Sequence, residues 1–332
     1  SDLEELGPQA LKGLSRPLYA FRVQRPSGVA SRFEAAALRG LTPLIGREVE
    51  IQLLLKRWEQ AKQGAGQIVL LSGEAGVGKS RIIRAFLEQA GTATDSRISY
   101  FCSPHHRSSA LYPVVEQLKR ALQLDRVAAS GKRLERLEAM LAALDLSVTE
   151  LAPVLAELLG LPAGVRRGDL GLAPDERRRK TLNALLAMFD AAALHEPIVV
   201  IVEDAHWVDP STEELLGLMV ERAATVPVLL VLTHRPECKP PWLEVAHVTS
   251  LSLNRLTRQE CATLVGRVAH EKGLPATVID QIVDKTDGIP LFVEELTKSI
   301  IESGVLSDVG DHYALVAPAH DLAIPASLHE DR

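Results

Sequence analysis

Residues 73–80 read G-E-A-G-V-G-K-S, and this segment is the strongest indication of the fold. It matches the phosphate-loop pattern G-x-x-x-x-G-K-[ST], in which glycines let successive backbone N–H groups turn inward onto phosphate oxygens. Lys79 would place a cation on the β- and γ-phosphates, and the Ser80 hydroxyl would bind Mg²⁺. The apolar run Gln67–Leu71 before the loop is typical of a buried strand, and Ser80–Gln89 after it has the pattern of a helix. This segment therefore predicts binding of a nucleoside triphosphate with magnesium.

Every residue of the loop, together with the next residue of the helix, is expected to contact the nucleotide. These residues are Gly73, Glu74, Ala75, Gly76, Val77, Gly78, Lys79, Ser80 and Arg81. The alternative is a glycine-rich turn without a ligand. The strand before the loop and the helix after it argue against that alternative.

A second apolar run, Ile198–Val202, ends in the acid pair Glu203–Asp204. Ligands bind beyond the carboxyl ends of parallel strands, so these carboxylates are expected at the site. Strand alternation points the two side chains to opposite sides. We assign the magnesium to Glu203, and the orientation or deprotonation of the attacking water to Asp204. The alternative is an acid pair that caps the next helix, although Asp209 before Pro210 is a better helix start.

The next strand candidate, Val226–Leu232, ends in Thr233-His234-Arg235. A polar side chain there would lie beside the γ-phosphate, and Arg235 could sense that group or stabilise the leaving charge. The alternative is an arginine exposed in a loop. For His206 and Trp207, which follow the acid pair, the sequence leaves open whether they line the site or pack in the core.

The apolar pattern elsewhere predicts a parallel α/β sheet, because strands alternate with helices. Further strands are expected at Ile98–Cys102 and Val245–Leu253, with short strand signals at Leu18–Val23 and a hairpin around Val305–Val316. Helices are expected at Glu48–Gln63, in three segments from Thr257 to about Ser303, and between Leu111 and Leu194. Expected breaks in that last region are at Gly131, Pro153, Pro162–Gly164 and Gly168–Pro174. The fold class is thus an α/β P-loop NTPase, in which helices flank a parallel sheet and a small helical region follows.

Composition narrows the function classes. The chain has 332 residues, of which 46% are hydrophobic and 24% charged, as in a soluble globular protein. A net charge of −6 does not favour a nucleic-acid partner, and the basic clusters Arg166–Arg167 and Arg177–Lys180 are expected to be solvated faces. No apolar run is long enough for a membrane span. The three scattered cysteines predict no disulfide framework or zinc site and favour the cytoplasm.

Five motifs, taken in order, resemble the STAND class of signalling ATPases within the AAA+ superfamily. They are P-L-I-G-R-E-V-E-I at 43–51, the phosphate loop, I-V-V-I-V-E-D-A-H-W-V-D at 198–209, L-L-V-L-T-H-R-P-E at 229–237 and D-G-I-P-L-F-V-E-E-L at 287–296. The segments F-C-S-P-H-H at 101–106 and S-A-L-Y-P-V at 109–114 are similar to the bacterial branch fused to class III adenylate/guanylate cyclase domains. The resemblance covers roughly residues 42–303.

This resemblance implies further site residues. Gly46-Arg47-Glu48 matches the family box near adenine and ribose, and Gly288 with Pro290 matches the lid element that contacts the base. Arg235 matches the first sensor of the family. Many members have Asp-Asp or Asp-Glu at the acidic strand end, whereas this chain has Glu203-Asp204. The departure leaves open how the two carboxylates divide their roles.

The resemblance also implies a domain organisation. Residues 1–25 resemble the last strands of a cyclase domain, followed by a linker at 26–41, a P-loop ATPase core at 42–253 and a helical lid at 254–304. Residues 305–332, with I-P-A-S-L at 324–328, resemble the start of a winged-helix-like domain. Both ends then look cut. Fused cyclase-like and helical-repeat domains, and a nucleotide-dependent oligomer, are the implied partners.

The expected function is an ATP-dependent signalling switch that uses ATP/ADP and Mg²⁺ and hydrolyses ATP slowly. One alternative is a non-hydrolysing nucleotide-bound scaffold, which Glu203 in place of Asp keeps open. Another is the regulatory part of a nucleotide cyclase, although the cyclase's own catalytic residues would lie outside this chain. No guanine-reading N-K-x-D motif is visible, so adenine is expected.

Overall fold

The computed structural model describes residues 2–9, 18–25, 33, 40–92, 96–126, 130–161, 173–242, 245 and 247–316. The expected breaks at 162–164 and 168–172, the basic pair at 166–167, nearly all of the expected linker and the motif at 324–328 lie outside these residues. The chain divides into two units, Ser1–Thr42 and Pro43–Arg332. None of the described helices is both long and apolar enough to cross a bilayer.

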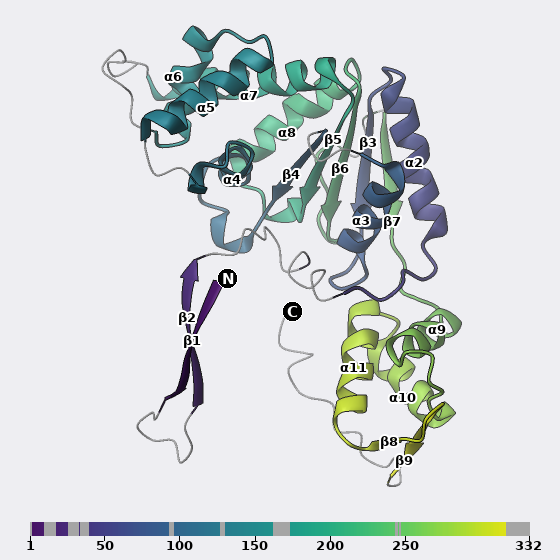
Figure 1. Cartoon of the computed structure of the whole chain (residues 1–332). Helices are drawn as coiled ribbons and strands as arrows, with labels where there is room; N and C mark the ends of the chain where they lie inside the picture. The colour runs from purple at the N-terminus through teal and green to yellow at the C-terminus, as the bar shows by residue number, and fades with distance from the viewer. Residues whose placement is uncertain are drawn as a thin grey trace. The chain divides into compact units, whose positions relative to one another are not determined.

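The first unit contains an antiparallel pair of strands, β1 (Asp2–Gln9) and β2 (Leu18–Arg25) (Figure 1). β2 confirms the short strand expected at Leu18–Val23. β1 has no such apolar pattern, and a register shift between Glu5 and Gly7 interrupts its pairing. Tyr19 and Phe21 of β2 are exposed.

The second unit is built on a five-stranded sheet in which every neighbouring pair is parallel. The strand order is β4 (Arg97–Phe101), β5 (Ile198–Glu203), β6 (Val228–His234), β3 (Gln67–Ser72) and β7 (Val248–Ser252). This confirms the expected α/β fold class. β6 runs two residues further than expected and pairs His234 with Ser72, so Arg235 is the first residue beyond the strand.

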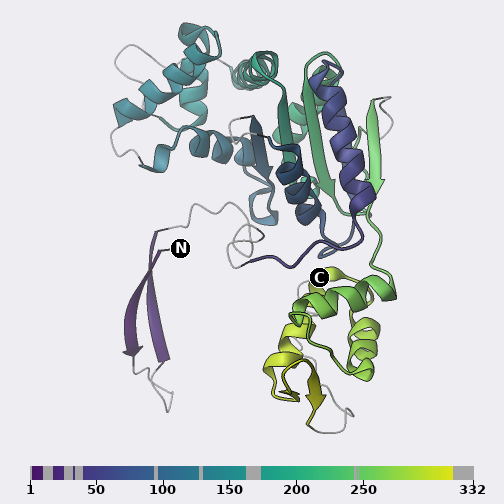
Figure 2. The same ribbon diagram turned by 45° about the vertical axis from the view of Figure 1, so that its right-hand side comes forward.

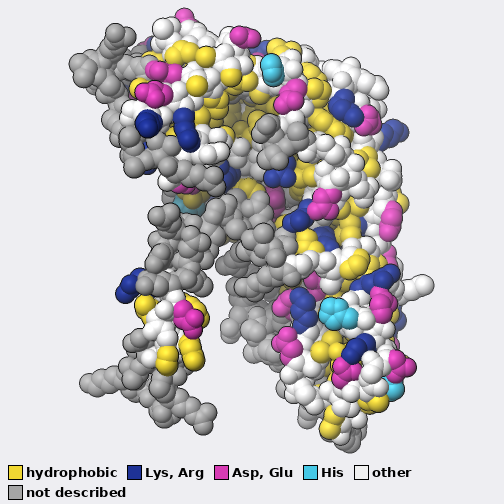
Figure 3. Space-filling view, viewed as in Figure 1, with side chains coloured by type: hydrophobic (Ala, Val, Ile, Leu, Met, Phe, Trp, Pro, Cys, Tyr) yellow, Lys and Arg dark blue, Asp and Glu magenta, His cyan; other side chains and the backbone are white. Residues whose placement is uncertain are grey.

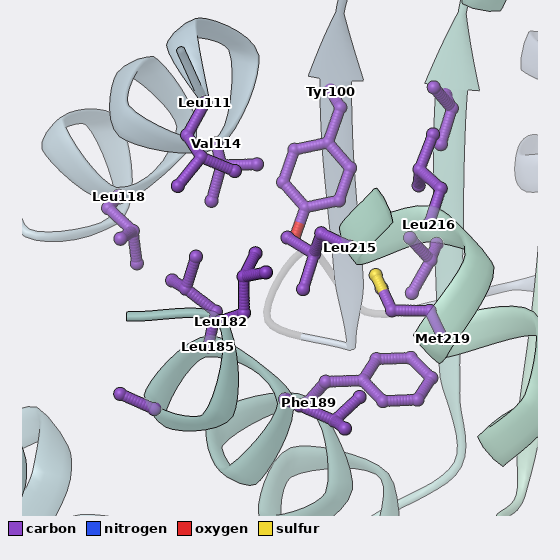
Figure 4. Packing of buried hydrophobic residues seen from close by; sticks show 14 of the residues in the cluster. Tyr100, Leu111, Val114, Leu118, Leu182, Leu185, Phe189, Leu215, Leu216 and Met219 are labelled. Carbon is purple, nitrogen blue, oxygen red and sulfur yellow. The ribbon is translucent and has the colours of Figure 1, made fainter. Parts of the chain in front are cut away.

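Helices cover both faces of this sheet, as Figures 1 and 2 show from two directions. One face packs on α2 (Glu48–Lys62) and α3 (Lys79–Ala90) through Val69 and Leu71 of β3. The other face packs through Ile68 and Leu70 on a layer that includes α4 (Tyr112–Ala121), α7 (Pro174–His195) and α8 (Pro210–Ala223). Alternation along one strand thus supplies two apolar cores. Figure 4 shows the second core, where residues of α4, α7 and α8 surround Tyr100.

One expected helix break is wrong, and another falls just before the expected glycine, between α4 and α5. Pro153 lies inside α6 (Val148–Leu158), and Gly131 lies in the first turn of α5 (Ser130–Ala143). The proline removes one backbone donor, but buried residues on both sides of it, Ala152 and Val154–Ala156, hold the helix in the core. At a helix start, the glycine leaves few intrahelical bonds at risk. Tertiary packing therefore overrides the local signal at Pro153.

Three helices follow the sheet, α9 (Arg258–Val268), α10 (Ala276–Thr286) and α11 (Pro290–Glu302), as the sequence predicts. We use the name lid for this helical region, after the expectation from the sequence. The expected hairpin is present as β8 (Leu306–Asp308) and β9 (Tyr313–Leu315). Leu306 is buried with the apolar faces of the three helices, so the hairpin shares the core of the lid. Charges of both signs are interspersed on the lid surface (Figure 3). Among them, Arg258 pairs with Asp280 and Asp284.

Candidate nucleotide-binding site

The phosphate loop joins the end of β3 to the start of α3. The N–H of Gly73 donates to the carbonyl oxygen of His234 at 3.2 Å, which fixes the entry of the loop to β6. Gly76 and Gly78 have φ values of 76° and 107°, which favour glycine, while Val77 between them is 1% exposed. The motif predicts a positive φ at Gly73 as well, but the φ of Gly73 is not positive. Instead, a Cβ there would lie 2.7 Å from Cγ1 of Val77.

The side chain of Lys79 lies along this loop. Its Nζ donates to the carbonyl oxygens of Gly73 at 2.7 Å and Glu74 at 2.9 Å. The residue is buried, and burial lowers the pKa of its ammonium group, while the charge of Asp204 opposes that shift. Lys79 thus brings a cation to a site where bound phosphates would compensate its burial.

Ser80 and Glu203 meet at the carboxyl edge of the sheet. The hydroxyl of Ser80, in the first turn of α3, donates to Oε2 of Glu203, the last residue of β5. A hydroxyl and a carboxylate are hard oxygen ligands that suit Mg²⁺, which usually takes one or two carboxylates together with substrate phosphates. The described residues contain no group of three or more His, Cys, Asp or Glu that could hold a metal alone. The donor set therefore fits a magnesium ion shared with a nucleotide.

Asp204 has a backbone conformation that the sequence did not predict. β5 ends at Glu203, and Asp204 follows with φ 56°, in the left-handed region. Its N–H donates at 2.8 Å to Oγ1 of Thr233, which is 1% exposed on β6. Strand alternation therefore does not fix the direction of Asp204. Thr233 holds the bend at Asp204, and Glu203 is the carboxylate in contact with Ser80.

Arg235, the first residue after β6, faces an aromatic ring. Its Cζ lies 5.9 Å from the ring centroid of Trp207, and its Nη1 lies 3.9 Å from Oε1 of Glu237. Arg107 is on the same ring, with its Cζ 5.4 Å from the centroid. Trp207 therefore contacts the guanidinium groups of two arginines that are far apart in the sequence.

Arg47 is directed at residues 253–257, the hinge that joins β7 to α9 of the lid. Its guanidinium is buried, and it donates to the carbonyl oxygen of Asn254 at 2.6 Å and to Glu50 at 3.2 Å. Gly46 before it has φ 67°, and a Cβ there would lie 2.0 Å from Oε1 of Glu260 in α9. The box G-R-E at 46–48 therefore packs closely against the hinge and the start of the lid.

The lid also contacts the phosphate loop itself. Arg255 of the hinge donates to both carboxylate oxygens of Glu74, at 3.0 and 2.8 Å, and pairs with Asp287 before α11. The N–H of Leu291 donates to the carbonyl oxygen of Gly76 at 3.2 Å. Charged and backbone contacts thus join the loop to two segments of the lid.

The remaining predicted residues lie around this junction. Pro290 is the first residue of α11. Gly288, two residues earlier, has φ 74°, and its carbonyl oxygen accepts a 2.8 Å hydrogen bond from the N–H of Leu256. Arg81 lies in α3, where burial lowers the pKa of its guanidinium and the charge of Glu294 in α11 opposes that shift. The structure therefore gathers the loop, the acid pair, Arg235 and the lid element around one sheet edge. Ala75 is the exposed tip of the loop.

Sequence reasoning missed Arg255, Thr233 and Arg107. Arg255 lies 181 residues from its partner Glu74, and nothing in its neighbours distinguishes it from other surface arginines. Thr233 belongs to the segment Thr233-His234-Arg235, which the sequence does single out. A polar residue buried at the end of a strand needs a hydrogen-bond partner, and that was the available signal for Thr233. Arg107 directly follows the motif F-C-S-P-H-H, which indicates no role for it by its residue types.

One curated protein and two solved structures show the following similarity to this chain. An uncharacterised protein of Rhizobium meliloti (strain 1021) is 30% identical over 301 residues, which is 90% of this chain but only 29% of that protein's length. A variant of RuvB from Thermotoga maritima has a TM-score of 0.42 at 17% identity, covering 78% of this chain and 62% of that one. A STAND protein with a tetratricopeptide repeat sensor from Pyrococcus horikoshii has a TM-score of 0.41 at 15% identity, covering 81% of this chain and 32% of that one.

A family model described as the AAA ATPase domain matches residues 43–231. The match contains the phosphate loop, the acid pair and most of the sheet, which are the elements that meet at the site. Because it spans more than half of the chain, this protein belongs to the AAA ATPase domain family of nucleotide-binding ATPases.

Proposed function

We propose that the chain binds ATP with Mg²⁺ at the phosphate loop and works as a switch in which nucleotide state controls the lid. The hydrogen bond from Leu291 to Gly76 carries this proposal, because the loop that would hold phosphates also holds the first turn of α11. A change in the loop is therefore transmitted directly to the lid.

The chain's own residues would bind the nucleotide in a defined way. Backbone N–H groups of the loop and the start of α3 would donate to phosphate oxygens, and Lys79 would turn its ammonium to them. Ser80 and Glu203 would hold the magnesium, which neutralises developing phosphate charge when bound. Gly288 and Pro290 would face the base. Arg47 would support base recognition indirectly, since its guanidinium is already engaged by Asn254 and Glu50.

Hydrolysis would rest on Asp204 and Arg235. Water attacks the γ-phosphorus, the bond to the β–γ bridging oxygen breaks, and ADP and inorganic phosphate leave. The Asp204 carboxylate would orient the water and accept its proton. Arg235 would leave Glu237 to reach the terminal phosphate. The bend at Asp204, held through Thr233, supports a role different from that of Glu203.

The five ordered motifs support a STAND-type signalling role with attached sensor or output domains, including cyclase-like ones. Oligomerisation with nucleotide, and a cytoplasmic location, stay predictions of the same resemblance. The scaffold alternative predicts that ATP binds and is not cleaved. Single-turnover phosphate release with the wild type and Lys79→Ala separates the two. The switch predicts slow release that the variant loses, whereas ATP that stays bound and intact would support the scaffold.

A further inference from the structure

The hinge runs alongside the start of the phosphate loop. The N–H of Leu253 donates at 2.8 Å to the carbonyl oxygen of Ser72, the last residue of β3 before the loop. At the other end of the hinge, the N–H of Leu256 donates at 2.8 Å to the carbonyl oxygen of Gly288. Main-chain hydrogen bonds therefore hold the hinge to the loop side at one end and to the lid at the other, and Arg255 lies between these two points.

The guanidinium of Arg255 joins three segments from this position. Its Nε and Nη2 donate to the two carboxylate oxygens of Glu74, the second residue of the phosphate loop, at 3.0 and 2.8 Å. Its Nη1 donates to Asp287, the residue that directly follows α10. Two parallel hydrogen bonds to one carboxylate fix the orientation of that group as well as its distance. One side chain thus connects the hinge, the phosphate loop and the lid.

Arg258, three residues later, provides an internal comparison. It also pairs with two carboxylates, those of Asp280 and Asp284, but both belong to α10. The side chains of Arg255 and Arg258 are 41% and 58% exposed, so solvent screens both sets of ion pairs. The two arginines differ in what they join. Arg258 acts within the lid, whereas Arg255 connects the lid and hinge to the loop.

We propose that Arg255 is a positioning residue that clamps the lid to the phosphate loop and slows the release of bound nucleotide. The inference rests on the proposed function, because it needs phosphates at the loop and the base at Gly288 and Pro290. A nucleotide held in this way leaves only when loop and lid separate, and Arg255 opposes that separation. The clamp acts through carboxylates of the protein, so it slows the release of ADP and ATP alike.

Arg255→Met removes the guanidinium and keeps an apolar stem of similar length. Fluorescent ADP and a non-hydrolysable fluorescent ATP analogue, each bound with Mg²⁺, are chased with excess unlabelled nucleotide, and the dissociation rate is measured. We expect both to leave about fivefold faster from Arg255→Met, with less than about a twofold change in the association rate. Arg258→Met is the matched control and should release both at the wild-type rate. Arg255→Lys, which lacks the two-pronged donor, should recover part of the effect.

Two further measurements separate a clamp from a general loss of stability. Glu74→Gln should also speed release, and the double variant Arg255→Met/Glu74→Gln should release nucleotide no faster than Arg255→Met alone, because both changes break the same contact. Salt screens exposed ion pairs. Raising the ionic strength should therefore accelerate release from the wild type more than from Arg255→Met.

Equal release rates for Arg255→Met and Arg258→Met would overturn the proposal. Additive effects of Arg255→Met and Glu74→Gln would also overturn it, because the two residues would then act independently. If Arg255→Met does not fold, Arg255→Lys must still release nucleotide faster than Arg258→Lys. A wild type that binds neither nucleotide, or a Lys79→Ala variant that binds both normally, would instead refute the proposed site itself.

Discussion

The main-chain N–H of Leu291 donates to the carbonyl oxygen of Gly76 at 3.2 Å. The first N–H groups of a helix have no acceptor within the helix. Here the phosphate loop supplies an acceptor for one of them. A Cβ on Gly76 would lie 3.1 Å from both Cγ2 of Ile289 and Cβ of Leu291, so the absence of a side chain lets the helix approach. The loop and the lid therefore form one mechanical junction.

Replacing Gly76 with alanine tests this junction. Gly76→Ala should strain the backbone at φ 76° and push α11 away, so amide exchange at residues 289–293 should rise in the nucleotide-free protein. Gly91→Ala is the matched control, because Gly91 has φ 60° with nothing within 4 Å of the added Cβ. Mass spectrometry measures the amide exchange of α11 in both variants. Equal exchange in Gly76→Ala and Gly91→Ala would contradict the close contact between Gly76 and α11.

Lys79→Ala should weaken ATP binding while the fold stays intact. Loss of a charge-assisted contact to phosphate is worth roughly 1.5–3 kcal/mol, or about ten- to a hundredfold in affinity. Titration with a fluorescent ATP analogue measures the change. Lys62→Ala, which removes a surface lysine paired with Glu59, is the control and should bind normally. If Lys79→Ala and Lys62→Ala bound ATP with equal affinity, the phosphate loop would not be the nucleotide-binding site.

The acid pair should separate binding from turnover. Glu203→Gln is expected to weaken magnesium-dependent ATP binding, because it removes the carboxylate beside Ser80. Asp204→Asn should keep binding and lose turnover, since an amide cannot accept the proton of water. ATP affinity with and without Mg²⁺, together with single-turnover hydrolysis, distinguishes them. The opposite pattern would reverse the two roles, and unchanged hydrolysis in both would favour the scaffold.

Asp209 should matter for stability. Its buried carboxylate accepts hydrogen bonds from the N–H groups of Ser211 and Thr212 at 3.0 Å and from that of Leu111 at 3.1 Å. Asp209→Ala removes a helix cap and leaves the Leu111 donor buried, so we expect a loss of about 2–3 kcal/mol in the free energy of unfolding. Thr257→Ala, at the exposed cap of α9, should cost about 1 kcal/mol. Urea denaturation measures both losses. Equal losses would mean that the hydrogen bond from Leu111 to Asp209 adds nothing to stability beyond the helix cap.

The sequence predicted the parts of the site whose chemistry is local. The strand, loop and helix around Gly73–Ser80 are contiguous, and Glu203 ends an apolar run that had to be buried. Contacts between distant segments carry no such signal. Arg47 reaches Asn254 across 207 positions, and Arg255 reaches Glu74 across 181.

Local signals also failed where packing opposed them. Pro153 should break a helix, yet its buried neighbours keep α6 continuous. The two sides assigned to the acid pair assumed that the strand continued to Asp204, whereas it ends one residue earlier in a bend that Thr233 stabilises. Backbone conformation at a strand end depends on the neighbouring strand, which one segment of sequence does not specify.

Hydrogen exchange with different nucleotides tests the switch most directly. Peptides covering the hinge at 253–257 and the start of α11 are compared in wild-type protein loaded with ADP·Mg²⁺ or with a non-hydrolysable ATP analogue and Mg²⁺, with Lys79→Ala alongside. A nucleotide-controlled lid should make these peptides exchange more slowly with the ATP analogue than with ADP, and the variant should lose the difference. Identical exchange in the two nucleotide states of a protein that binds both would contradict it.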